Sequence, residues 1–220
     1  MALVKSEPKT LALGIEYRGT AFNGWQVQPD HPSVQAALEA ALSQFADHPI
    51  SVICAGRTDT GVHATHQVVS FTSVARRPSA GWIRGVNAIL PESVAVRWMR
   101  EVDEKFHARF SARSRTSECQ AKTPVRTISE LKIVRRGALV GVRITANAFL
   151  QHMVRNIVGA LIYVGTGRER PEWIAEVLAA KSRDAAAPTF SPAGLYLTGV
   201  GYPEHPHLPQ LSSGPFGKVF

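Results

Sequence analysis

The chain has 220 residues, of which 45% are hydrophobic, and it carries a formal net charge of +8. This apolar content excludes an intrinsically disordered protein, two cysteines exclude a disulfide framework, and no apolar run reaches the length of a membrane span. Most of the basic residues are arginines, whose planar fork suits phosphate, so the charge favours a polyanionic partner such as nucleic acid over a basic enzyme without such a partner.

The first half of the chain alternates predicted strands with predicted helices. Apolar residues alternate or run together over 11–17, 51–55, 67–71 and 94–99, which predicts strands there. A helical stripe begins after Ser33, whose hydroxyl suits an N-cap, and a second one over 82–90 ends before Pro91.

The second half repeats this plan. Residues 131–134 and 139–144 predict a hairpin, 153–162 predict a helix with a strong apolar face, and Pro171 suits the first turn of another helix. A last strand is predicted over 195–202. We therefore expect two α/β halves, which the resemblance described below divides into 1–115 and 116–220.

The segment richest in reactive side chains follows the second predicted strand and contains Asp59 between two threonines. Gly56 and Gly61 allow sharp turns on either side of this carboxylate. Asp59 can act as a nucleophile at a sugar carbon, as a general base, or as a cap of its own turn. It could also bind a metal with His63 and His66, although no carboxylate that would orient these histidines is nearby. The residues alone leave these alternatives open.

The same segment resembles the signature of the tRNA pseudouridine synthase A family. Further segments resemble other motifs of that family in the same order, and together they cover nearly the whole chain. The segments are 17–26, 55–63, 87–91, 106–112, 147–159 and 194–197.

The resemblance implies a fold and an activity. The expected fold class is α+β, with two sandwich halves of mainly antiparallel sheets flanked by helices and a catalytic cleft between them. The expected enzyme isomerises uridine to pseudouridine at positions 38, 39 and 40 in the anticodon stem-loop of tRNA. It is expected to need no cofactor and no metal, to form a homodimer, to lie in the cytoplasm and to have no contact with a membrane. The polar N-terminus, which lacks the apolar core of a signal peptide, agrees with that location.

The resemblance also implies roles for particular residues. Asp59 corresponds to the nucleophile and Arg155 to the guanidinium that keeps this carboxylate ionised. Leu195 corresponds to an apolar wall of the uracil pocket, and Arg57 to a residue that positions the flipped nucleotide or its phosphate. Candidates for contact with the tRNA backbone are Arg109 and Arg113. Without the resemblance, Arg155 would be interpreted as a solvated helix charge and Leu195 as strand core.

One segment of the family pattern is missing. After Arg115, family members continue with a strand that carries an active-site tyrosine, and then with a helix. Here a stretch of about 50 residues is absent, so the second half is expected to lack its first strand and a helix. No tyrosine lies between Tyr17 and Tyr163. The alternative function is therefore a shortened, weakly active or inactive member of the family that binds tRNA.

Overall fold

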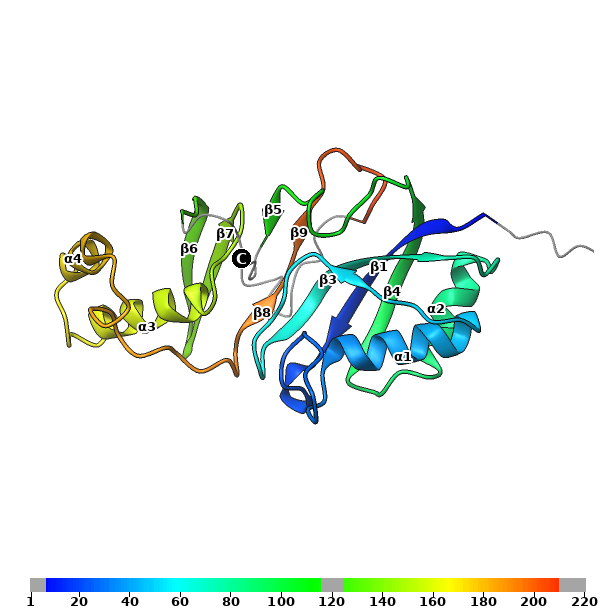
Figure 1. The fold of residues 1–220 in the computed structure, drawn as a ribbon. Helices are drawn as coiled ribbons and strands as arrows, with labels where there is room; N and C mark the ends of the chain where they lie inside the picture. Colours follow the sequence, from blue (N-terminus) through cyan, green and yellow to red (C-terminus); the bar gives the residue numbers. More distant parts are fainter. Residues whose placement is uncertain (1–6, 116–124, 210–220) are drawn as a thin grey trace, which may run out of the picture.

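The computed structural model describes residues 7–115 and 125–209. Within them, two sheets lie side by side in an elongated molecule, each with its own pair of helices (Figure 1). The first sheet has the order β2-β3-β1-β4, and a short strand, β8, is added beside β3. Its strands are β1 (Lys9–Tyr17), β2 (Ile53–Cys54), β3 (His63–Ser73), β4 (Val94–Val102) and β8 (Tyr196–Leu197).

The first sheet is antiparallel except where β8 runs parallel to β3. Two helices pack on it, α1 (Val34–Ala46) and α2 (Ser79–Asn87), and aromatic contacts of Trp82 with Phe45 and Phe71 connect them to the sheet. A 3-10 turn, η1 (Gly19–Ala21), follows β1. The hydroxyl of Ser33 accepts a hydrogen bond from the Ala36 amide, which confirms the predicted N-cap. The main core of the molecule lies in this half.

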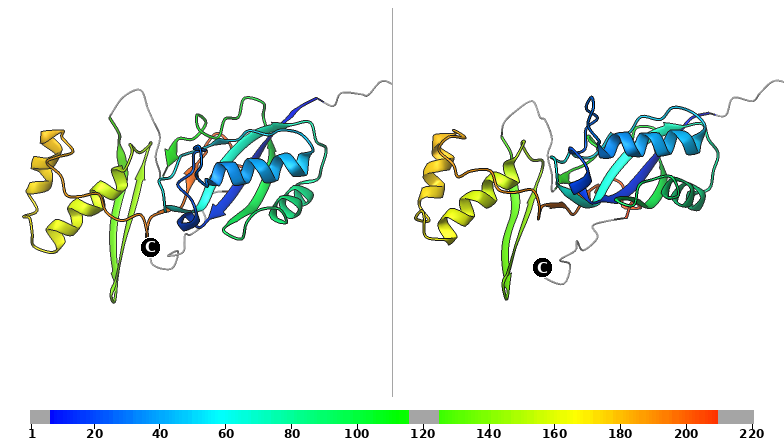
Figure 2. Two further views of the ribbon diagram at one scale, coloured as in Figure 1. Left: turned by 60° about the horizontal axis from the view of Figure 1, so that its bottom comes forward. Right: turned by 90° about the horizontal axis from the view of Figure 1, so that it is seen from below.

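The second sheet has the order β6-β7-β5-β9 and a much smaller core. Its strands are β5 (Ser114–Arg115), β6 (Ile128–Arg136), β7 (Leu139–Ala146) and β9 (Val200–Gly201). Helix α3 (Met153–Gly165) packs on the β6–β7 hairpin, and α4 (Trp173–Ala180) lies at the far end (Figure 2). The fully buried residues of its own described core are Ile144, Ala146 and Phe149.

The mixed fold with antiparallel sheets confirms the expected fold class, and the hairpin and four helices of the described residues form at or near the predicted positions. Helix α2 begins and ends about three residues before the predicted 82–90, and Pro171 precedes α4 rather than lying in its first turn. The single strand predicted over 195–202 is wrong. It is two short strands, β8 in the first sheet and β9 in the second, because the chain crosses from one sheet to the other within this segment. The strand predicted over 51–55 is short, and Ile53 is 41% exposed rather than buried.

The crossing segment positions the candidate site. β8 lies between the two halves and pairs with the start of β3, immediately after the loop that contains Asp59 (Figure 1). Leu197, Tyr202 and Leu208 then pack into the main core, so the C-terminal part of the described chain returns to the first half. Two features of the sequence lie outside the described residues: Cys119, and the junction that follows Arg115. Of the helices in the described ranges, none has the length and hydropathy needed to cross a membrane.

Candidate active site

The loop between β2 and β3 is held in place on the N-terminal side of Asp59. The Tyr17 hydroxyl lies 2.8 Å from the hydroxyl of Thr58, and the Trp25 amide donates to the Thr58 carbonyl at 2.9 Å. The buried side-chain amide of Gln67 donates to the Gly56 carbonyl. Burial also raises the pKa of Tyr17, so its hydroxyl stays neutral. These contacts fix the backbone next to Asp59 without using its carboxylate.

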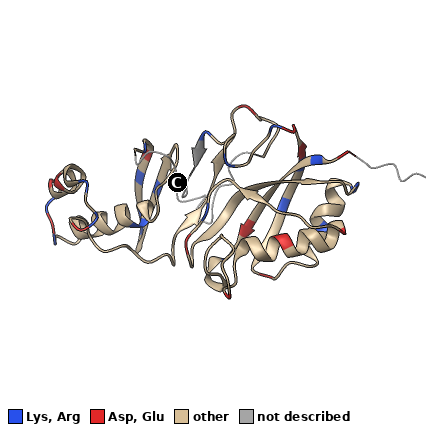
Figure 3. Ribbon diagram, viewed as in Figure 1, with Lys and Arg blue, Asp and Glu red and all other residues tan. Residues whose placement is uncertain are grey.

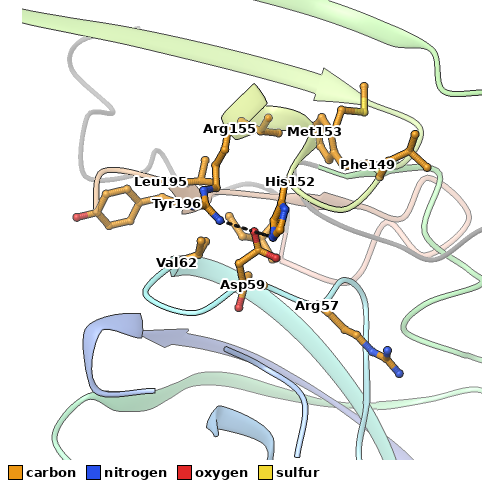
Figure 4. Close-up of a pocket in the computed structure, with 13 residues that line it drawn as sticks. Arg57, Asp59, Val62, Phe149, His152, Met153, Arg155, Leu195 and Tyr196 are labelled. Atoms are coloured by element: carbon orange, nitrogen blue, oxygen red, sulfur yellow. Dashed lines mark hydrogen bonds and ion pairs between the residues drawn. The ribbon is translucent and has the colours of Figure 1, made fainter. Parts of the chain in front are cut away.

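The carboxylate of Asp59 forms an ion pair with Arg155, the third residue of α3. Arg155 Nη1 donates to Asp59 Oδ2 at 3.0 Å (Figure 4). Arg155 Nε donates to the Phe190 carbonyl at 2.7 Å. The side chains of Asp59 and Arg155 are only 14% and 16% exposed. The structure therefore brings together the two residues expected to be catalytic, which lie on different halves of the molecule.

His152 is a second neighbour of the same oxygen, and sequence reasoning missed it. Its Nε2 lies 3.4 Å from Asp59 Oδ2, and its ring is 41% exposed. The residue precedes α3 and has a φ of 58°, in the left-handed region that costs a non-glycine residue about 1 kcal/mol or more. Such strain at a site residue is consistent with a functional constraint. The sequence contained one indication of this role. His152 lies three residues before Arg155, within the segment 147–159 that resembles a motif of the family.

A small pocket surrounds the ion pair, and its other walls are mostly apolar. They include Val62, Phe149, Met153 and the expected wall residue Leu195. The cavity measures about 30 Å³, which is room for about one water molecule. The walls come from the β2–β3 loop of the first half, from the start of α3 in the second half and from the segment that contains β8. The pocket therefore lies between the two halves.

A tyrosine also lines this pocket, although none occurs in the part of the sequence where the family pattern has one. Tyr196, on β8, stacks on the ring of His63 with centroids 4.7 Å apart, and its ring extends away from Asp59 (Figure 4). His63 in turn accepts a hydrogen bond from the Gly19 amide at Nδ1, and burial lowers its pKa. Both rings thus support the loop, and the Tyr196 ring is not aimed at the carboxylate.

His63 and His66, which could have bound a metal together with Asp59, make other contacts in the structure. His66 is buried beside Trp98, with centroids 6.1 Å apart, and burial lowers its pKa. Over residues 7–115 and 125–209, no group of three or more potential ligands is arranged to hold a metal ion.

The three remaining candidate arginines occupy different places. Arg57 borders the pocket, but its side chain points away from Asp59 (Figure 4). Arg109 lines a second, larger hollow that also includes Arg57. Arg113 lies outside both cavities and forms an exposed ion pair with Glu204 at 2.6 Å. The structure therefore places Arg57 nearest to the ion pair, and Arg113 farther away on the surface.

Comparison with known proteins identifies the chain's relatives. A family model described as tRNA pseudouridine synthase matches residues 14–111 and 112–203. The tRNA pseudouridine synthase A of Shewanella frigidimarina is 46% identical over 254 aligned positions, which cover 93% of this chain and 97% of that protein. The enzyme of the same name from Shewanella woodyi is 47% identical with the same coverage. That from Paraburkholderia phytofirmans is 41% identical over 263 positions, covering 96% of this chain and 97% of the relative.

These alignments contain more positions than this chain has residues. Since 93% of 220 residues is about 205, about 50 of the 254 positions shared with the Shewanella frigidimarina protein have no counterpart here. This number of positions agrees with the stretch of family sequence that was expected to be absent from this chain after Arg115.

Proposed function

The chain belongs to the tRNA pseudouridine synthase family and is thus an isomerase, and we propose that its substrates are uridines 38, 39 and 40 in the anticodon stem-loop of tRNA. The observation that carries the proposal is the partly buried ion pair between Asp59 and Arg155 in a pocket between the two halves. The proposal places the reaction in the cytoplasm, without a cofactor.

Asp59 acts as the nucleophile in this proposal. Its carboxylate forms a covalent bond at the target nucleotide while the bond between uracil N1 and the sugar C1′ breaks. The uracil turns, and its C5 bonds to C1′ as the bond to Asp59 breaks and the carboxylate is released; C5 then loses a proton and N1 gains one. The product has the same composition as the substrate, so no oxidant, reductant or energy source is consumed.

The supporting geometry is that of a positioned, largely dehydrated carboxylate. The loop contacts of Thr58 and Gly56 fix the backbone beside Asp59, and Arg155 fixes the carboxylate itself. The apolar walls, including Val62 and Leu195, exclude water from the reacting bond. A volume of about 30 Å³ is too small for a base, so the pocket has to enlarge as a flipped uridine enters.

Binding of tRNA is supported by the distribution of charge. Lys and Arg lie on both halves of the molecule (Figure 3). On the β6–β7 hairpin, Lys132 lies directly opposite Arg143, and Arg136 is on the same face. Like charges opposite each other destabilise a sheet, and a bound phosphate backbone would offset this repulsion. The proposal also includes a homodimer; the exposed apolar residues Leu131 and Ile133 on edge strand β6 are consistent with such an interface.

The test compares Asp59→Ala with the unchanged protein. We expect the variant to lose pseudouridine formation, measured by mass spectrometry of digested tRNA, and to keep its tRNA affinity within a few-fold, because the loop is held by Thr58 and Gly56. Pseudouridine formation by Asp59→Ala would contradict the nucleophile assignment.

About 50 aligned positions of the Shewanella frigidimarina protein have no counterpart in this chain, which favours a second candidate function. In this alternative the chain binds tRNA but does not catalyse the isomerisation. This candidate predicts salt-sensitive binding of tRNA by the unchanged chain with no pseudouridine formed. Product formation by the unchanged chain would exclude it.

A further inference from the structure

A hollow beside the candidate active site is much larger than the pocket at Asp59. It measures about 300 Å³, ten times the pocket volume of about 30 Å³. Ligand pockets in proteins start at roughly 300 Å³, so the hollow has the size of a small-molecule site while the pocket does not. Arg57 borders both cavities. A strand of RNA that delivers one nucleotide to Asp59 therefore has the hollow next to its path.

The chemistry of the lining suits a nucleotide. Two guanidinium groups, three aromatic rings and two side-chain amides border the hollow, and none of the described lining residues is acidic. The guanidinium groups suit a phosphate, the rings of His107 and Phe110 suit a base, and the Gln26 amide can donate to or accept from the edge of a base. Trp25 is only 1% exposed and the Gln35 amide is bonded to Val27 and Glu39, so these two residues form the floor of the hollow. These residues are Arg57 and Arg109, Trp25, His107 and Phe110, and Gln26 and Gln35.

Phe110 is the most exposed aromatic residue of this set. Its side chain is 75% exposed, although burial of an apolar ring is favourable. His107 supports it, with ring centroids 4.2 Å apart and an angle of 31° between the planes, and the Arg109 guanidinium carbon lies 5.8 Å from the ring centre. Phe110 therefore presents an aromatic surface to solvent at the rim of a cationic hollow.

The turn beneath this ring is held by several hydrogen bonds. His107 Nδ1 accepts from the backbone amides of Arg109 and Phe110, both at 3.2 Å. The Ser111 amide donates to the His107 carbonyl at 2.9 Å, and the Ser111 hydroxyl accepts from the His107 amide. A ring on such a turn loses little conformational entropy when a ligand stacks on it, which favours binding.

We propose that this hollow binds an unpaired nucleobase next to the target uridine, stacked on Phe110, with the intervening phosphate between Arg57 and Arg109. The inference rests on the proposed function, because it takes the RNA substrate as the ligand. It adds a binding site that is separate from the uracil pocket and selects for an unstacked neighbour. A base pair at that position would be a poor ligand, because both faces of its bases are already stacked.

The test uses stem-loop RNA in which 2-aminopurine, whose fluorescence falls on stacking, replaces one base at a time around the target uridine. We expect one flanking position to be quenched by the unchanged protein and not by Phe110→Ala. Loss of one stacked base should weaken RNA binding roughly 5- to 150-fold. Phe110→Trp should retain both the quenching and the affinity. Leu178→Ala is the matched control, since Leu178 is 72% exposed on α4.

The readout does not require turnover, so it separates this inference from the proposed reaction. If the protein binds the stem-loop but Phe110→Ala behaves like Leu178→Ala, the second site is excluded while the reaction stands. If only the probe at the target position depends on Phe110, the assignment to a neighbouring base is overturned. If the unchanged protein binds no RNA, the proposed function itself fails.

Discussion

At Asp59, two nitrogen atoms from the start of α3 approach the same carboxylate oxygen. Arg155 Nη1 lies 3.0 Å and His152 Nε2 lies 3.4 Å from Oδ2. Arg155 is also tied to the Phe190 carbonyl, so its guanidinium joins the catalytic loop, α3 and the segment that leads to β8. A planar fork can make both contacts at once, whereas an ammonium is a single point of charge.

Arg155→Met should therefore lower the rate of pseudouridine formation strongly. A charge-assisted hydrogen bond in a largely buried pair contributes about 1.5–3 kcal/mol, which corresponds to a loss of roughly 10- to 150-fold. Arg155→Lys should recover only part of this loss. The measurement is single-turnover kinetics at saturating protein. Arg170→Met is the control, because Arg170 forms an exposed ion pair with Glu176 on the same half, and it should change the rate little. An unchanged rate in Arg155→Met would contradict the role of this ion pair.

His66 should make folding stability depend on pH. Burial lowers its pKa below the ordinary value of 6.5, an effect that a hydrogen bond to the backbone of Pro209 partly opposes. Below pH 6.5 the unfolded chain takes up a proton that the folded chain resists. The stabilising contribution is therefore complete above pH 6.5, and it is lost as the pH falls from there toward the folded pKa.

We expect the free energy of unfolding, measured with urea between pH 5.5 and pH 8, to fall toward the acidic end by at most about 1.4 kcal/mol per pH unit for this group. His66→Gln should flatten the curve. His31→Gln, at an exposed loop position, should leave its shape unchanged. An identical pH dependence in His66→Gln and the unchanged protein would contradict the assignment. His63, whose pKa burial also lowers, contributes in the same direction.

At the scale of elements, α3 depends on a close approach of the chain to one of its glycines. A Cβ on Gly159 would lie 2.4 Å from the Pro188 carbonyl oxygen, so no side chain fits there. The approaching segment continues to Thr189, which hydrogen-bonds to Asn156, and to Phe190, which holds Arg155. Gly165, at the end of the same helix, has no atom within 4 Å of such a Cβ.

This difference provides a matched pair of variants. Gly159→Ala should cost about 1–3 kcal/mol of stability, because the segment must move, and it should also lower activity by shifting the carbonyl that holds Arg155. Gly165→Ala should be neutral or stabilise by up to about 1 kcal/mol, since alanine favours a helix. Urea unfolding and an activity assay of both variants test this. Equal effects of the two variants would show that the approach of Pro188 does not matter.

Some of the secondary structure could be predicted correctly from the sequence pattern, and some could not. The Ser33 cap, the hairpin and helix α3 follow from neighbouring residues, and the structure confirms them. The apolar face predicted for α3 is only partly buried, at Met153, Val154 and Ile157. The last strand was mispredicted, because its apolar residues do not record that the chain leaves one sheet and enters another. The strand predicted over 51–55 does form, as β2, but it is shorter than predicted and Ile53 is exposed. Its conformation follows from pairing with β3 rather than from its own burial.

At the scale of the whole molecule, the two halves differ greatly in how much they bury. The first half contains the main core, while the second has three fully buried residues in its own described cluster and exposes Leu139 and Val140 to 62% each. About 50 aligned positions of a relative have no counterpart in this chain. The thin core of the second half agrees with the loss of packing partners.

The net charge of +8 gives a prediction that belongs to this scale. Affinity for tRNA should fall steeply with salt, since phosphate contacts release counterions. Removing one such contact with Lys132→Gln should weaken binding for all RNA sequences alike and reduce the slope of log affinity against log salt by about 0.7–0.9. Lys9→Gln, which removes the partner of Glu101 at the far end of β1, is the control. An unchanged slope for Lys132→Gln would show that the β6–β7 hairpin is not part of the RNA-binding surface.

The sequence by itself determined the family, the glycine-bracketed loop of Asp59, the helical stripe that carries Arg155 and the alternation of elements in both halves. Each of these depends on residues close together in the chain, where the period of apolar positions and the turn residues are visible. The resemblance predicted that Arg155 pairs with Asp59, 96 positions away, and the structure supplies the geometry of that contact. Only the tertiary structure decided that His152 joins them and that Phe110 and Arg57 border one hollow. Such contacts depend on how distant segments pack, and the local pattern of a strand or helix carries no record of its partner.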